Sequence, residues 1–362
     1  MSSFAMIGNW RRTPTLERFA EGIKAEMEKN GFQLDPEVSP DIQLVLNFVD
    51  PDKPQHFRRH GKGTFVATIA ETDRATDNIL YAGYPILIRS LGNFMIYLDR
   101  SQAEPKTHFI TLEQGCYSTV KRENEDGYFA EVFQRLRPLA TSKLVIDNVF
   151  HPDLPETLWN GDETSESLYH AGKKLDEMNL LPTPFPIEEL LSPKEFRHIK
   201  RLYGVGGLSY GNLSARQKDN QFWMSASGVN KSNLKEIGRD ILLVKGYDDK
   251  LSAMELSVPP QVQPKRVSVD AIEHWMIYAE HPDVGAIVHI HAWMDGVPST
   301  EVNYPCGSIQ LAETVAELIR QSDNPSQTVI GLKNHGLTIT GRDLDDIFER
   351  IEGKIIPQVP MS

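Results

Sequence analysis

The strongest chemical signal in the sequence is a pair of histidines, His289 and His291, at the end of the apolar run 282–291. Such a run is typical of a buried strand. Side chains two apart on a strand point to the same face. The two histidines are therefore expected on one face of the strand, with Val288 and Ile290 on the other face. Two imidazoles at this spacing can bind one ion at about 2.0–2.1 Å. The alternative is a pair of core histidines that are hydrogen-bonded to the backbone.

A third histidine, His335, lies in the segment 329–337, a short apolar strand that breaks at Asn334 and Gly336. Glycine permits a backbone bend that turns the imidazole inward. Taken alone, this histidine is more simply interpreted as a turn residue. Together with the upstream pair it predicts an open, Lewis-acidic site of three histidines and water for a divalent cation.

An acidic residue, Asp270, stands near the start of a helix predicted over 268–278, with Ser268 as its cap. A carboxylate in the first turn of a helix interacts favourably with the helix dipole. One interpretation of Asp270 is therefore a charge that stabilises the helix start. The other, which we adopt as a prediction, is the acid or base of the metal site.

Two glycine-containing loops, 204–214 and 225–231, precede the histidine strand. Glycine lets backbone amides approach an anion closely, while Asn, Ser and Lys side chains add donors and a positive charge. The residues expected to bind a small carboxylate or phosphate are Gly211, Asn212, Ser227, Gly228 and Lys231. The alternative is that both loops are turns without a ligand.

The elements that carry these residues are expected in the second of two domains, 1–185 and 186–362. Three prolines between 182 and 186 mark the boundary, because they can continue neither a helix nor a central strand. A helix capped by Ser192 is expected just after it. The first domain is predicted to be mixed α/β, with strands at 42–50, 63–71, 93–99 and 142–150 and helices at 16–29 and 129–140.

Composition narrows the class of protein. The net charge of −12 argues against nucleic acid or an anionic membrane as a partner. No apolar run reaches the ~18–20 residues that cross a bilayer, and the N-terminus lacks the pattern of a secretory signal. The two cysteines, Cys116 and Cys306, exclude a disulfide framework. A cytoplasmic protein is therefore expected.

The ordered set of motifs resembles the class II aldolase/adducin superfamily over about residues 190–350. The resemblance does not reach the first domain. The matching marks are Gly211-Asn212-Leu213-Ser214, Ser227-Gly228-Val229, Ser268 with Asp270, His289-Ile290-His291 and Asn334-His335-Gly336.

This resemblance implies an α/β/α sandwich with a mostly antiparallel central sheet, and a homo-oligomer such as a tetramer. It implies a divalent metal, usually zinc, on three histidines that match His289, His291 and His335. It adds Ser268 to the residues that bind substrate phosphate. Three departures are visible. Asp270 stands where the family has glutamate, Val269 replaces a serine, and only 43 residues separate the second histidine from the third.

The resemblance predicts a metal-dependent lyase of the retro-aldol or decarboxylation type. Its substrate would be a small anionic hydroxy or oxo acid or sugar derivative, cleaved through an enediolate. Zinc is the expected metal, with Fe²⁺ or Mn²⁺ as alternatives. Epimerisation, an iron-dependent oxygenation and an adducin-like module without catalysis remain as other functions. Metal analysis separates them, since zinc favours a lyase, iron an oxygenase and no metal a scaffold.

Overall fold

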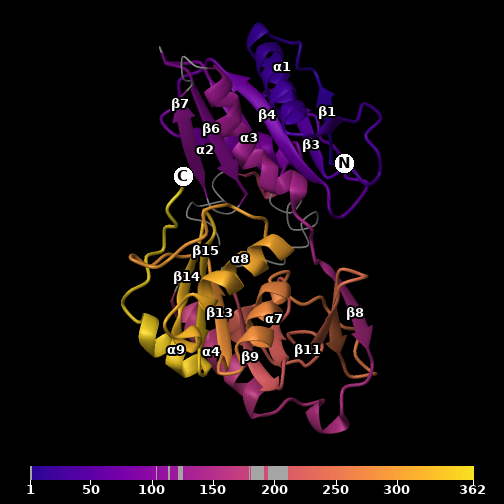
Figure 1. Cartoon of the computed structure of the whole chain (residues 1–362), viewed down its shortest axis with the longest axis vertical. Helices are drawn as coiled ribbons and strands as arrows, with labels where there is room; N and C mark the ends of the chain where they lie inside the picture. The colour runs from indigo at the N-terminus through magenta and orange to yellow at the C-terminus, as the bar shows by residue number, and fades with distance from the viewer. Residues whose placement is uncertain are drawn as a thin grey trace. The chain divides into compact units, whose positions relative to one another are not determined.

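The computed structural model describes residues 2–102, 104–112, 115–120, 125–178, 180, 191–194 and 211–362 (Figure 1). The chain divides into two compact units. Unit 1 comprises Met1–Ser142, Phe185–Ile199 and Met361–Ser362, and unit 2 comprises Lys143–Pro184 and Lys200–Pro360. The proline-rich stretch at 182–186, the expected helix beyond residue 194 and the loop 204–210 lie outside the described residues.

Unit 1 is built on a seven-stranded sheet in the order β2-β1-β3-β4-β5-β6-β7. Strands β1 to β5 pair in parallel, and β6 and β7 continue the sheet antiparallel. The strands are β1 (Ser3–Gly8), β2 (Gln33–Leu34), β3 (Leu44–Phe48), β4 (Phe65–Thr72), β5 (Phe94–Asp99), β6 (Lys106–Thr111) and β7 (Cys116–Val120).

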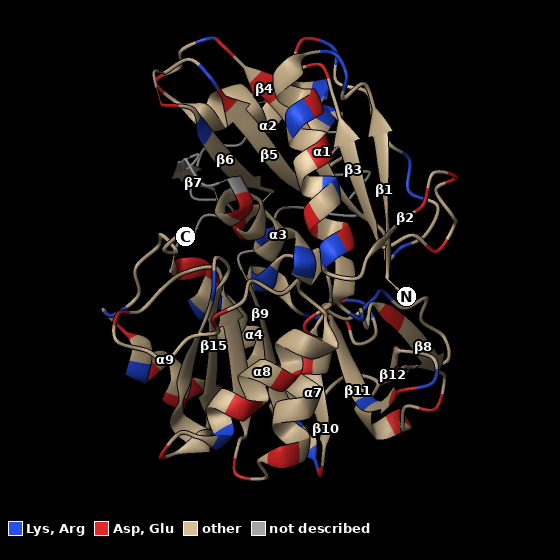
Figure 2. Cartoon of the chain, turned by 45° about the horizontal axis from the view of Figure 1, so that its top comes forward, with Lys and Arg blue, Asp and Glu red and all other residues tan. Residues whose placement is uncertain are grey.

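Within the described part of unit 1, three helices accompany this sheet: α1 (Pro14–Lys29), α2 (Ile79–Arg89) and α3 (Glu125–Thr141). Helices α1 and α3 pack on the face that carries Phe4, Leu46 and Ile96. Alternate strand residues such as Val45 form a smaller cluster on the other face, as the two-residue period of a strand requires. Figure 2 shows basic and acidic residues interspersed along α1, which is typical of a solvated helix face.

Unit 2 contains an eight-stranded sheet in the order β14-β15-β13-β9-β10-β11-β12-β8. Every pair is antiparallel except β12 with β8. The strands are β8 (Asp147–His151), β9 (Gly211–Lys218), β10 (Gln221–Ser225), β11 (Ile241–Asp248), β12 (Ala253–Ser257), β13 (Ala286–Ile290), β14 (Val329–Leu332) and β15 (Gly336–Gly341).

Helices pack on both faces of the unit 2 sheet. Alternate residues of β13 enter different cores: Ile287 joins the cluster of α7 and α8, while Val288 joins that of α4 and α9. The helices are α4 (Glu163–Glu177), α7 (Ala271–Glu280), α8 (Ile309–Arg320) and α9 (Leu344–Ile351), with 3₁₀ turns η1 (Glu156–Leu158), η2 (Lys231–Asn233) and η3 (Pro325–Gln327). Among all described helices, none combines the length and apolar character needed to cross a membrane.

The first division between the units along the chain falls after Ser142, ahead of the expected boundary at 185. Strand β8 pairs with β12 in parallel, from Asp147 opposite Ala253 to His151 opposite Ser257. Helix α4 packs on β9 and η2. Residues 143–177, which the sequence analysis assigned to the first domain, therefore complete the sheet and core of unit 2.

Candidate metal centre

The three predicted histidines lie in and just after β13 and in the turn that precedes β15, its neighbour in the unit 2 sheet. His289 lies in β13, and His291 follows its last residue. His335 lies in the turn between β14 and β15. Because β13 pairs antiparallel with β15, with Ile290 opposite Leu337, the turn that carries His335 reaches the C-terminal end of β13.

The three imidazoles converge. One ring nitrogen from each lies within 4.8 Å of the other two, and all three residues are buried. The ring centroids of His289 and His335 are 4.7 Å apart, and those of His289 and His291 are 5.2 Å apart. This is a compact donor set of the type that zinc and other divalent ions accept.

The hydrogen bonding of His289 fits a metal ligand. Its Nδ1 lies 3.0 Å from the carbonyl oxygen of Leu337 and donates to it. The tautomer that donates there carries a lone pair on Nε2, and this buried atom has no hydrogen-bond partner among the described residues. A second ring nitrogen fixed by a backbone carbonyl is the usual arrangement of a metal-binding histidine.

Burial disfavours the charged form of two of the site histidines. It lowers the pKa of His289, against the opposing effect of the Asp270 carboxylate. Burial, with His289 and His291 nearby, also lowers the pKa of His335 well below its ordinary value. A neutral imidazole has the lone pair that a metal requires.

Two glycines let the backbone come close enough for this geometry. A Cβ on Gly336 would lie 2.1 Å from the carbonyl oxygen of Ile290, and one on Gly211 would lie 2.0 Å from that of His289. The bend itself is made by Asn334, which has a φ of 55°. The glycine at 336 is therefore required by strand packing, and the bend falls two residues earlier than expected.

Asp270 lies at the helix start, as predicted, but Ser268 does not cap the helix. Asp270 is the N-cap residue of α7 and its side chain makes no capping bond. Its Oδ2 instead accepts hydrogen bonds from Nδ2 of Asn212 (2.7 Å) and from Oγ of Ser268 (3.3 Å). Its Oδ1 is buried and has no hydrogen-bond partner within the described part of the chain. One carboxylate oxygen is thus held in place while the other is available.

The residues predicted to bind an anion divide into two groups. Asn212 and Ser268 hold Asp270, and Gly211 is explained by the close approach of β13. Ser227 is exposed and Gly228 has a φ of 67° in a turn. For all of these residues the anion pocket remains a prediction.

Lys231, the cation expected to help bind an anion, is buried. Only 3% of its surface is exposed, and its Nζ donates to the carbonyl oxygen of Val229 at 3.3 Å. Burial lowers the pKa of this amine to about 8. A buried ammonium is costly unless an anion compensates its charge, and the role of Lys231 in binding an anion remains a prediction.

Two polar residues of α7, Glu273 and His274, contact the strands of the candidate site, and the sequence patterns did not predict this. Glu273 is buried and accepts a hydrogen bond from Oγ1 of Thr338 at 2.5 Å. His274 is fully buried, with Nδ1 2.7 Å from Oγ of Ser214. The signal was present, because residues three and four after Asp270 lie on the same helix face.

The charge states of these two side chains are set by burial. Burial, together with the Asp270 carboxylate, raises the pKa of Glu273 to about 8. Burial, together with His289, lowers the pKa of His274 to about 3. Both side chains are therefore uncharged at neutral pH.

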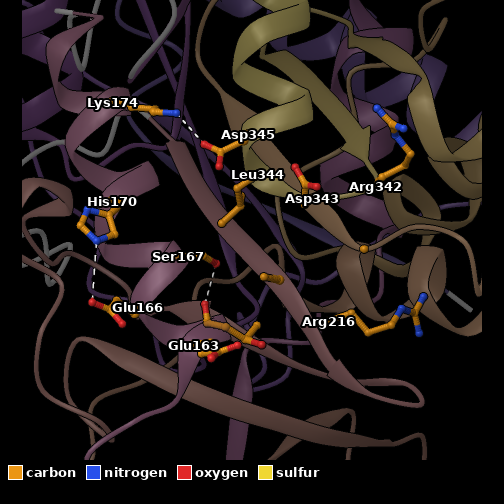
Figure 3. A pocket seen from close by; sticks show the side chains of 13 residues that line it. Glu163, Glu166, Ser167, His170, Lys174, Arg216, Arg342, Asp343, Leu344 and Asp345 are labelled. Carbon is orange, nitrogen blue, oxygen red and sulfur yellow. Dashed lines mark hydrogen bonds and ion pairs between the residues drawn. The ribbon is translucent and has the colours of Figure 1, made fainter.

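A large cavity of about 810 Å³ lies elsewhere in unit 2 and contains none of the three histidines. Figure 3 shows its lining, which comes largely from α4 and from the start of α9. Its cations already have partners. Lys174 pairs with Asp345 at 2.6 Å, and Arg216 donates to the carbonyl oxygens of Val284 and His281 at 2.8 Å each.

Comparison with known proteins agrees with the motifs of unit 2. Residues 195–297 match the family of the class II aldolase and adducin N-terminal domain. A methylthioribulose-1-phosphate dehydratase of Leptospira biflexa is 28% identical over 180 residues, which cover 47% of this chain and 81% of the relative. An L-fuculose phosphate aldolase of Methanocaldococcus jannaschii is 29% identical over 173 residues, which cover 42% of this chain and 82% of the relative.

Two solved structures show a distant likeness. An L-fuculose 1-phosphate aldolase has a TM-score of 0.36 and 19% identity, covering 53% of this chain and 81% of that chain. YgbL of Escherichia coli, described as a putative aldolase/epimerase/decarboxylase, has a TM-score of 0.34 and 20% identity, covering 52% of this chain and 83% of that chain.

Proposed function

We propose that the C-terminal half of this chain, which is similar to class II aldolase/adducin proteins, is a metal-dependent lyase. Its substrate is a small anionic hydroxy or oxo acid or a sugar derivative. The observation that supports this most directly is the convergence of three buried imidazoles beside a carboxylate with one available oxygen. Zinc is the metal we expect, and we expect a homo-oligomer.

A divalent metal bound there supplies positive charge that polarises a substrate carbonyl and stabilises negative charge on the neighbouring atoms. His289, His291 and His335 would hold it, with the lone pair of His289 Nε2 already oriented by the bond from Nδ1 to Leu337. The similarity to an aldolase and to a dehydratase fits this chemistry, because carbon–carbon and carbon–oxygen cleavage next to a carbonyl both develop negative charge there.

Asp270 moves the proton. Asn212 and Ser268 fix Oδ2 of the carboxylate, so Oδ1 is left to accept or return a proton at the substrate. The aspartate is one methylene shorter than glutamate, and the two donors compensate by restricting its orientation. A fixed base with a defined direction is what general acid–base catalysis requires.

The experiment is a substrate screen with the metal-loaded and metal-free protein, using phosphorylated ketoses and small 2-oxo and hydroxy acids. We expect turnover that depends on metal and yields a fragment, CO₂ or a product lighter by one water. Mass spectrometry distinguishes these outcomes. Turnover without a change of mass would indicate an epimerase and overturn the lyase. Turnover at the same rate after metal removal would overturn the metal's role.

A further inference from the structure

Cys306 is a residue for which the sequence analysis found no role, and it lies at the candidate metal centre. It precedes α8 and is half-buried. Its sulfur is 3.3 Å from Nε2 and 3.8 Å from Nδ1 of His335. The thiol therefore contacts one of the three converging imidazoles.

This contact and a metal compete for the same nitrogen. A thiol donates its proton to the ring nitrogen that carries a lone pair, and a metal binds that same lone pair. An ion that binds Nε2 of His335 must therefore displace the S–H···N contact. The sulfur would then be left beside the ion without its former acceptor.

The distance suits two ligands of one ion. With zinc bonds of about 2.0–2.1 Å to nitrogen and about 2.3 Å to sulfur, a tetrahedral site places the two donor atoms about 3.5 Å apart. The separation between Sγ of Cys306 and Nε2 of His335 is 3.3 Å. The sulfur is not among the atoms that share the 4.8 Å cluster, so ligation needs its side chain to rotate about the Cα–Cβ bond.

A second, independent observation points to a ligand at this place. Nε2 of His289 is buried and has no hydrogen-bond partner among the described residues. This nitrogen belongs to the same histidine cluster as the ring of His335 that Cys306 contacts, and its lone pair can bind a metal ion.

We infer that Cys306 is a fourth protein ligand of the metal, which gives a three-histidine, one-cysteine site in the absence of substrate. This inference rests on the proposed function, because it presupposes that the three histidines bind a metal. On binding, the sulfur–metal bond forms and the thiol proton passes to solvent. Because thiolate is a soft ligand, the site favours zinc or cobalt over manganese.

The test uses Co²⁺, whose spectrum reports its ligands. The full-length protein is freed of metal with a chelator and loaded with one equivalent of Co²⁺. Three forms are compared: wild type, Cys306→Ser and the control Cys116→Ser. The chain has two cysteines. A thiolate-to-cobalt charge-transfer band in the near ultraviolet must therefore come from one of them.

We expect visible cobalt bands in all three forms and a charge-transfer band in the wild type and Cys116→Ser alone. In Cys306→Ser, zinc affinity should fall at least about tenfold, while manganese affinity changes little. X-ray absorption of the zinc-loaded wild type, which needs no variant, should show one sulfur at about 2.3 Å.

Visible cobalt bands without a charge-transfer band, or a zinc shell without sulfur, would overturn the cysteine ligand and leave the three-histidine site intact. The absence of visible cobalt bands from the wild type would overturn the three-histidine site and this inference together.

Discussion

Replacing Glu273 with glutamine tests whether this carboxyl is neutral in the folded protein. The folded state holds the proton up to a pKa of about 8, whereas an ordinary glutamate releases it near 4.5. Between these values the folded protein binds more protons than the unfolded chain, so its free energy of unfolding falls as pH rises. Glutamine has the same shape, cannot ionise and keeps an oxygen that accepts the bond from Thr338.

The size of the stability loss follows from the difference between the pKa of Glu273 in the folded protein and that of an ordinary glutamate. Each unit of pKa difference corresponds to about 1.4 kcal/mol. Over the interval from about 4.5 to about 8, the loss of stability approaches a limit on the order of 5 kcal/mol. Glu273→Gln lacks this loss. Its stability relative to wild type should therefore increase by up to about 1.4 kcal/mol per pH unit within that interval.

The assay is urea unfolding of the metal-free protein at several pH values, followed by the fluorescence of tryptophans such as the buried Trp223 of unit 2. Glu177→Gln, an exposed position on α4, serves as the control and should show no trend. A constant difference between Glu273→Gln and wild type from pH 5 to pH 8 would refute the reasoning. Glu273 would then ionise as an exposed carboxyl does.

Three further predictions concern the site and its frame. His289→Ala should lose the bound metal while the fold is kept, as measured by elemental analysis and circular dichroism; full metal content would contradict the assignment. Asp270→Asn should keep the metal and lose at least about 100-fold in turnover, as expected for a general acid or base; unchanged turnover would exclude it. Gly336→Ala should destabilise the protein by about 1–3 kcal/mol in thermal unfolding, because its Cβ would overlap the carbonyl oxygen of Ile290. Gly63→Ala, whose Cβ meets nothing within 4 Å, should change little.

The histidine cluster could be predicted because the patterns that indicate it lie within short stretches of sequence. Strand β13 lies inside the predicted run, and a period of two places His289 and His291 on one side. The turn that carries His335 is equally visible as a break between two short strands. In unit 1, the predicted strands at 42–50, 63–71 and 93–99 correspond to β3, β4 and β5 for the same reason.

The role of Asn212 could not be predicted, because it depends on a contact across 58 residues of sequence. From the motif we predicted that the side-chain amide of Asn212 donates to a bound anion. In the fold this amide donates a hydrogen bond to the carboxylate of Asp270. Cys306 was missed for a similar reason, since nothing near it in sequence indicates that His335 lies beside it.

Helix α2 was not predicted, because Pro85 lies in its interior and a proline inside a segment argues against a helix.

Strand β8 and helix α4 have a consequence for any attempt to study the second unit on its own. A fragment that begins at residue 186 would lack both elements, although they supply a neighbour for β12 and a cover for β9. It would also remove Asp162, which accepts a hydrogen bond from Nε1 of Trp223 at 3.2 Å. An uncovered strand edge beside exposed apolar side chains is prone to aggregate. Aggregation of such a fragment would therefore result from the choice of its first residue. A fragment that begins near residue 143 keeps β8 and α4 and avoids this problem.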